Sequence, residues 1–299
     1  MKQAFIKLHL SILIAGFTGI FGKLITLNEG LLVWYRMLIT SILLFIILWF
    51  SKKLQRISFR EALRIGGVGL LLGLHWVFFY ASIKASNVSI GVVCFSMTCF
   101  FTAIFEPIIN KRRISVKELL FSIVALCGIA LIFHFDMRYR TGIILGIISS
   151  AMAALFVITN KRVGANHTWS TMLLYEMIGG FLCLSCLLPI YLYLFPTGYL
   201  IPGRLDIMYL LLFSLFCTIG LYMLQIQALK HISAFTVNLS YNLEPIYSII
   251  LAMIIFGEAK ELDWSFYLGL LLIILSVVLQ MCSVVYQQTK IKREKIATS

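Results

Sequence analysis

The stretch LLVWYRMLITSILLFIILWFS, residues 31–51, carries a single charged side chain, that of Arg36. The hydrocarbon core of a bilayer is about 30 Å thick and takes about 20 apolar residues per helix, so this stretch is long enough to cross it. Nine further stretches of similar composition flank it. The sequence therefore predicts an all-α integral membrane protein with ten transmembrane helices, at residues 8–27, 31–51, 62–83, 87–110, 116–135, 141–160, 171–195, 206–229, 233–256 and 263–286.

The composition excludes a soluble domain. The 299 residues have a mean hydropathy of +0.99, and only 12% of them are charged, against about 25% in soluble domains. The net charge of +13 does not indicate nucleic-acid binding, because the basic residues gather at helix ends. All seven cysteines fall inside apolar stretches. We expect them to be packing residues, with no disulfide, no metal site and no other cofactor.

The distribution of lysine and arginine predicts the orientation in the membrane, since cytoplasmic connections carry an excess of both. With the N-terminus in the cytoplasm, the inner connections and termini hold 18 basic residues and the outer connections hold 5. The sequence therefore predicts a multi-pass protein of the cell (inner) membrane with both termini cytoplasmic. Its partners are then the lipid bilayer and a small-molecule substrate, in a monomer or homodimer.

The second half of the chain repeats the first. Tyr35-Arg36-Met37 recurs as Tyr175-Glu176-Met177, and Lys84 at the end of the third stretch matches Lys230 at the end of the eighth. A unit of five spans that is duplicated inserts its second copy upside down, and inverted repeats build a site at the membrane midplane. We therefore predict a first repeat over residues 1–138, a second over 139–286 and a basic cytosolic tail over 287–299.

Two short motifs carry a family resemblance. Asn242-Leu243-Glu244-Pro245, followed by Gly257-Glu258 and Gly269, resembles the pattern that ends each repeat of the EamA family in the drug/metabolite transporter superfamily, and residues 74–81 resemble its third helix. The first repeat departs from this pattern, with Cys99 at the proline position and Lys111-Arg112 in place of Gly-Glu. The resemblance implies an inverted bundle around a central cavity, and members mostly carry small metabolites, often amino acids, outward.

The ninth stretch is the best candidate for a substrate path. Pro245 has no amide hydrogen, so the helix is expected to kink and to free the carbonyl of Tyr241, which is tolerated in lipid only next to protein or a wet cavity. Asn238, Tyr241, Asn242 and Pro245 share one helical face by their spacing. The alternative interpretation of these polar residues is hydrogen bonding between helices.

Charged residues inside the spans are the candidates for coupling or gating. A carboxylate costs about 2.5–3.5 kcal/mol at mid-span and is rarely retained without a use, so Glu244 is the candidate for proton coupling or substrate contact. The alternative is an ion pair or a helix cap. Arg36, Glu176 and Lys23 lie nearer the helix ends, where snorkelling to an interface competes with a gating role. Glu106 is expected to pair with residues 111–113.

Aromatic and polar residues on the third, fourth and eighth stretches suggest a lining for the cavity. Such a lining suits an amino-acid side chain, or an organic cation through cation–π contact. A lone membrane histidine such as His75 is otherwise a packing residue. The predicted substrate-binding residues are His75, Trp76, Phe79, Tyr80, Phe95, Ser96, Tyr222, Gln225, Asn238, Tyr241 and Asn242, and the predicted coupling or gating residues are Glu244, Pro245, Arg36 and Glu176.

The function expected from these patterns is transport of a small, amino-acid-like solute by alternating access, with export implied by the resemblance and proton coupling as a further hypothesis. Alternatives are export of organic cations, drugs or nucleosides by the same fold, or a passive channel or assembly subunit. An enzyme is not expected, because the five histidines are scattered singly and no nucleophile has an obvious base.

Overall fold

The computed structural model describes residues 2–111, 116–135, 137–164, 167–229, 240–241 and 243–297, and these form helices and turns only. The elements in chain order are α1 (Lys2–Leu24), α2 (Glu29–Phe50), α3 (Phe59–Ala85), α4 (Val88–Phe95), α5 (Thr98–Ile109), α6 (Val116–Phe135), η1 (Met137–Tyr139), α7 (Arg140–Val163), α8 (Trp169–Leu194), α9 (Arg204–Ser214), η3 (Leu215–Gly220), α10 (Leu221–Leu229), α12 (Glu244–Phe256), η4 (Glu258–Lys260) and α13 (Trp264–Ala297).

The all-helical, membrane-spanning class is confirmed. Within the described residues, seven helices are long and apolar enough to cross a bilayer: Lys2–Leu24, Glu29–Phe50, Phe59–Ala85, Val88–Ile109, Arg140–Val163, Trp169–Leu194 and Arg204–Gln225. Shorter apolar helices cover Glu244–Phe256 and Trp264–Ser276. The expected boundaries shift in places, because α1 begins already at Lys2 and α13 continues through the expected tail to Ala297.

Side-chain caps set several helix starts. The side chain of Asn28 accepts a hydrogen bond from the amide of Leu31 at the start of α2, and Asn87 does the same for Ile90 at the start of α4. Ser58 and Glu61 form a reciprocal capping box that starts α3 three residues before the expected boundary. Such residues satisfy amides that have no partner within the helix, which explains why each connection ends where it does.

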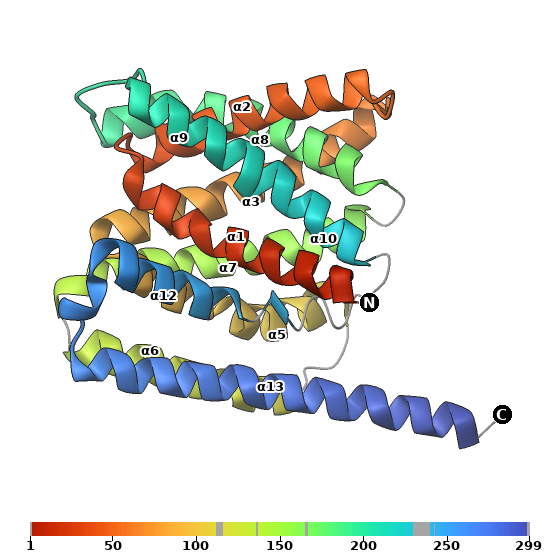
Figure 1. Cartoon of the computed structure of the whole chain (residues 1–299), viewed down its shortest axis with the longest axis vertical. Coiled ribbons are helices and arrows are strands. Elements are labelled where there is room, and N and C mark those ends of the chain that lie inside the picture. Colours follow the sequence, from red (N-terminus) through yellow and green to blue (C-terminus); the bar gives the residue numbers. More distant parts are fainter. Residues whose placement is uncertain are drawn as a thin grey trace.

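The helices from the two halves of the chain interleave. In Figure 1, α6 and α13 run side by side as one outer layer, α2, α8 and α9 form the opposite layer, and α1, α3, α7 and α12 lie between them. Helix α3 packs against α7 and α8, and α1 packs against α12 and α10. Both termini lie at the same end of the bundle, and α13 projects beyond it there (Figure 1). Each half therefore contributes helices to the centre.

Matching interruptions occur in the fourth and ninth predicted spans. The fourth is divided at Ser96–Met97 into α4 and α5, and in the ninth α12 begins only at Glu244, after the turn at Leu243. The sequence predicted that Pro245 would kink one continuous helix, but the structure begins a new helix at Glu244. Pro245 lies in the first turn of α12, where the missing amide hydrogen would have no helical partner in any case.

The turns that follow these two spans also correspond. Gly257 ends α12 with a φ of 68°, and Lys111, after α5, adopts a φ of 51°. This left-handed conformation is ordinary for glycine and uncommon for other residues. Lys111-Arg112 stands where the second repeat has Gly257-Glu258, so the backbone turn is retained at Lys111 although the glycine is not.

The tightest crossing between helices joins α3 and α8. A Cβ atom added to Gly69 would overlap the backbone of Glu176, and one added to Gly180 would lie 2.7 Å from the carbonyl oxygen of Gly69. Small residues of this kind let two membrane helices approach until their backbones are in van der Waals contact. The crossing positions α3, which carries most of the aromatic residues of the candidate site.

Candidate functional site

A cavity of about 210 Å³ lies at the centre of the bundle. Its walls come from α1, α2, α3, α4, η3, α10 and α12, and so from both halves of the chain. The lining residues are Ala15, Thr18, Arg36, Leu72, His75, Trp76, Phe79, Tyr80, Val92, Phe95, Cys217, Thr218, Leu221, Tyr222, Tyr241, Glu244, Pro245 and Ser248.

Most of the predicted site residues meet in this cavity. The structure brings together His75, Trp76, Phe79, Tyr80, Phe95, Tyr222, Tyr241, Glu244, Pro245 and Arg36. Ser96 instead lines a small apolar cleft beside α13, and its hydroxyl group has no hydrogen-bond partner within the described part of the chain. Glu176 lines a second cavity. Asn238 and Asn242 lie outside the described residues.

Gln225, in the eighth predicted span, is not among the residues that line the cavity. Regular α-helical spacing puts Thr218, Tyr222 and Gln225 on one face. The structure has a π-helical segment, η3, over Leu215–Gly220. This segment ends before Leu221, so the spacing from Tyr222 to Gln225 remains that of a regular α-helix. Thr218 and Tyr222 both line the cavity, together with Cys217 and Leu221, whereas Gln225, nearly one turn beyond Tyr222 in α10, does not.

The sequence suggested that Arg36 could snorkel to an interface. The structure instead buries Arg36 in the cavity wall, with an exposed fraction of 2%. Its Nη1 donates to the Tyr80 hydroxyl at 2.5 Å, and its Nε and Nη2 donate to Thr218 Oγ1 at 3.3 and 3.0 Å. The rings of Trp76 and Phe213 lie against the guanidinium, with their centroids 3.7 and 3.9 Å from Cζ. These partners lie far from Arg36 in sequence, so the position of Arg36 in its own span did not reveal them.

His75 is hydrogen-bonded to Ser149, in the second half of the chain. Its Nδ1 lies 2.8 Å from the hydroxyl and 3.1 Å from the carbonyl oxygen of Ser149 on α7, and the Ser149 hydroxyl donates to the His75 carbonyl. A donor role for Nδ1 satisfies the carbonyl oxygen. The ring also stacks on Phe95 with centroids 5.3 Å apart. His75 is therefore a fixed part of the wall of the cavity.

Tyr222 lines both the central cavity and a second cavity of about 320 Å³. Glu176 lines this second cavity, and its carboxylate accepts a hydrogen bond from the Asn160 side chain at 2.7 Å. Glu176 is buried, with an exposed fraction of 1%, and does not snorkel to an interface. Lys161, which lines the same cavity, pairs with Glu106 at 3.3 Å. Glu106 was expected to pair with residues 111–113, and its partner in the structure is Lys161. Of residues 111–113, Arg112 and Arg113 lie outside the described residues.

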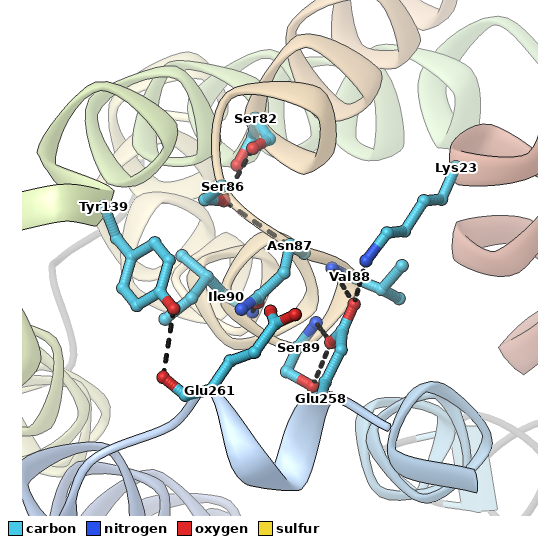
Figure 2. A network of polar contacts seen from close by, with 10 residues as sticks. All are labelled: Lys23, Ser82, Ser86, Asn87, Val88, Ser89, Ile90, Tyr139, Glu258 and Glu261. Atoms are coloured by element: carbon cyan, nitrogen blue, oxygen red, sulfur yellow. Dashed lines mark hydrogen bonds and ion pairs between the residues drawn. The ribbon is translucent and has the colours of Figure 1, made fainter. Parts of the chain in front are cut away.

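A polar cluster lies at the end of the bundle opposite the termini (Figure 2). Glu258, whose side chain is fully buried, accepts hydrogen bonds from the amides of Val88 and Ser89, each at 2.9 Å, and from the Ser89 hydroxyl at 2.7 Å. Lys23 completes the cluster with an ion pair at 2.9 Å. We call these four residues the Glu258 cluster. It joins the ends of α1 and α12 to the first turn of α4.

The backbone places Glu258 in this position. Gly257 turns the chain through a left-handed conformation at the end of α12, and the next residue meets the free amides at the start of α4, where a carboxylate is favoured. Burial opposes ionisation of Glu258, but the hydrogen bonds from Ser89, Lys23 and Val88 outweigh it and hold its pKa below the usual value. Lys23 was expected to snorkel and instead pairs with Glu258. The Gly-Glu motif was the available signal for this cluster.

Comparison with known proteins agrees with this architecture. The profile of the EamA-like transporter family matches residues 4–134 and 140–282. No curated protein matches the sequence. One solved structure, entitled "Crystal structure of protein", superposes with a TM-score of 0.57 over 93% of this chain and 96% of its own, at 13% sequence identity, and so shares the fold. The two matched segments cover nearly the whole chain, and the chain belongs to the EamA-like transporter family of multi-pass membrane proteins.

Proposed function

We propose that the protein carries a small, amino-acid-like solute across the inner membrane by alternating access. Ten membrane-spanning segments form two inverted repeats, over residues 1–138 and 139–286, and both termini are cytoplasmic. The observation that carries the proposal is the central cavity of about 210 Å³, which is walled by both repeats and contains Arg36 and Glu244. Midplane sites between inverted repeats are typical of carriers. Export is the expected direction.

The two ends of the cavity suggest two gates. The Glu258 cluster joins α1, α4 and α12 at the end opposite the termini, which is the outer end in the proposed orientation. Tyr222 lines both the central cavity and the second cavity, which Glu176 also lines. Access from the cytoplasm would then require the Tyr222 ring to move, and release outward would require the cluster to open.

Counterflow in proteoliposomes tests the carrier directly. Purified protein should exchange radiolabelled L-leucine or L-phenylalanine for the same unlabelled amino acid, and the rate should saturate with concentration. A passive channel gives flux that neither saturates nor exchanges. Flux without saturation for every solute tried would reject the carrier in favour of that alternative.

The inverted topology predicts opposite labelling of two exposed turns. Lys111→Cys and Lys260→Cys each introduce a thiol at an exposed position after α5 and α12. In sealed inside-out vesicles, a membrane-impermeant maleimide should label Cys at position 111 and not at position 260, and the pattern should reverse in right-side-out vesicles. The parent protein controls for the seven native cysteines. Labelling of both turns from one side would contradict the inverted repeats.

Glu244 is the proposed coupling residue, because it lines the cavity at the start of α12. Glu244→Gln is expected to leave the melting temperature within a few degrees and to abolish uptake driven by an imposed pH gradient. Glu106→Gln is the matched control, since Glu106 also precedes a proline but pairs with Lys161 away from the cavity. Unchanged gradient-driven transport by Glu244→Gln would show that Glu244 does not couple protons.

A further inference from the structure

Arg36 is a buried cation whose described partners are all uncharged. It lies in the wall of the central cavity with an exposed fraction of 2%. Its hydrogen-bond acceptors are the hydroxyl groups of Tyr80 and Thr218. Among the residues that the structure describes, no carboxylate forms an ion pair with it. Charged side chains inside membranes are costly and normally face a partner or a wet cavity, so the missing counter-ion needs an explanation.

The hydrogen bonds of Arg36 leave donors free for a ligand. A guanidinium group has five N–H donors, and the three bonds to Tyr80 and Thr218 use one each on Nε, Nη1 and Nη2. Within the described part of the chain, one donor therefore remains on each terminal nitrogen. The rings of Trp76 and Phe213 lie against the group and cover its faces. A ligand can then approach only along the edge, in the plane of the guanidinium.

That approach suits a carboxylate. Two parallel N–H donors in one plane bind the two oxygens of a carboxylate in a bidentate pair, and arginine provides this planar fork whereas lysine does not. Thr218 belongs to the π-helical segment η3, and Tyr80 lies on α3 in the other half of the chain. The fork is thus held in position by both repeats, which is what a site shared between them requires.

The rest of the cavity suits an apolar body. His75, Phe79 and Phe95 form an aromatic group with ring centroids 5.3 to 6.0 Å apart. The cavity volume is about 210 Å³, and an apolar cavity of about 150 Å³ in another protein binds benzene. Glu244, which also lines the cavity, forms no ion pair with Arg36 in the described structure and is available to an ammonium group.

We propose that Arg36 binds the carboxylate of the transported solute, and that the solute is a small carboxylate with an apolar or aromatic body. This inference rests on the proposed carrier function and narrows its substrate class. An α-amino acid belongs to this class, and its ammonium group is compatible with Glu244. Organic cations without a carboxylate are disfavoured, because they would leave Arg36 without the anionic partner that it also lacks among the described residues.

Three ligands with the same phenyl-alkyl skeleton but different charged groups test whether the cavity selects a carboxylate. L-Phenylalanine carries both charges, 3-phenylpropanoate keeps only the carboxylate, and 2-phenylethylamine keeps only the ammonium. Thermal shift and calorimetric titration of the purified full-length protein should show binding of L-phenylalanine and 3-phenylpropanoate, and at least tenfold weaker binding of 2-phenylethylamine. Equal or tighter binding of the amine would overturn the assignment, and so would a failure of both carboxylates to bind.

Variants of Arg36 test the residue itself. Arg36→Gln should weaken both carboxylates at least tenfold and relieve the discrimination against 2-phenylethylamine, while the surface control Arg204→Gln changes neither. If Arg36→Gln does not fold by size-exclusion chromatography, Arg36→Lys keeps the charge without the fork, and Thr218→Val removes one of its supports. Both should weaken carboxylate binding and still exclude the amine. Unchanged carboxylate affinity in Arg36→Lys and Thr218→Val would overturn the proposal.

The two proposals fail differently. Absence of saturable counterflow for every solute rejects the carrier. Saturable counterflow that depends neither on a carboxylate in the solute nor on Arg36 rejects only the assignment of Arg36 and leaves the carrier in place.

Discussion

Replacing Gly69 with alanine is expected to lower the melting temperature of the purified protein by several degrees and to slow transport. A Cβ atom at this position would lie 2.9 Å from the Cα of Glu176 and closer still to its carbonyl oxygen. These are backbone atoms of α8, so no side-chain rotation can relieve the overlap and the two helices must separate. Overpacking costs about 1–3 kcal/mol in well-packed cores, which corresponds to roughly 2–5 °C for a protein of this size.

The same helix contains a matched control. An added Cβ on Gly67, two residues away, would meet no atom within 4 Å. Gly67→Ala is therefore expected to leave the melting temperature unchanged or to raise it slightly, because alanine favours the helix by about 1 kcal/mol over glycine. Both variants are compared by thermal unfolding in detergent and by counterflow. Equal melting temperatures for Gly69→Ala and Gly67→Ala would show that the α3–α8 crossing is looser than the structure indicates.

The opposing residue allows a second check on this crossing. Gly180→Ala would place a Cβ 2.7 Å from the carbonyl oxygen of Gly69, so one separation of the helices relieves both overlaps. The double variant should then lose less stability than the two single variants added together, as expected for residues that share one contact.

The fold could be predicted from the sequence to a large extent, because a membrane-spanning helix is specified by the composition of its own consecutive residues. A run of apolar residues of the right length, such as 31–51, predicts a helix wherever it packs. The caps at Asn28, Ser58 and Asn87 are also local, since each bonds an amide three residues ahead. The repeat and the motifs then indicated that the third, fourth, eighth and ninth spans would face a common cavity.

The candidate site was predictable only where its geometry follows regular spacing. His75 and Phe79 are four residues apart on a regular helix and both reach the cavity. Gln225 was expected in the cavity and does not line it, because helical spacing gives the face on which a residue lies but not where along the helix the cavity ends. Arg36 was misread for another reason. Its hydroxyl partners, Tyr80 and Thr218, lie 44 and 182 residues away in sequence, and only the packed structure shows that they meet.

Replacing Glu258 with glutamine is expected to open the end of the bundle that the Glu258 cluster closes. The change removes the ion pair with Lys23 and places amide hydrogens among the donors of Val88 and Ser89. Losing one partner of a buried pair costs about 3–5 kcal/mol in soluble proteins, mainly because the other charge stays buried. The Lys23 side chain is 31% exposed, which reduces this cost. A shift of about 1.4 kcal/mol toward the open state would already raise its population tenfold.

The native Cys217 reports this opening. It lines the central cavity with an exposed fraction of 4%. With the other cysteines replaced, a membrane-impermeant thiosulfonate added from the outer side should modify Cys217 at least tenfold faster in Glu258→Gln than in the parent. Glu261→Gln, an exposed carboxylate of the same turn, is the control and should label at the parent rate. Equal rates for Glu258→Gln and Glu261→Gln would mean that the cluster is not a gate.

The pH dependence of this labelling follows from the sign of the shift at Glu258. Its pKa in the folded protein is held below the ordinary value of 4.5, so the ionised carboxylate stabilises the closed cluster fully at neutral pH. That stabilisation is lost only as the pH falls through the lowered pKa. Labelling of Cys217 in the parent should therefore be independent of Glu258 titration between pH 8 and pH 5, and should accelerate below about pH 4.5, after correction for reagent reactivity measured on a free thiol. Glu258→Gln lacks the titrating group and should show no such acceleration.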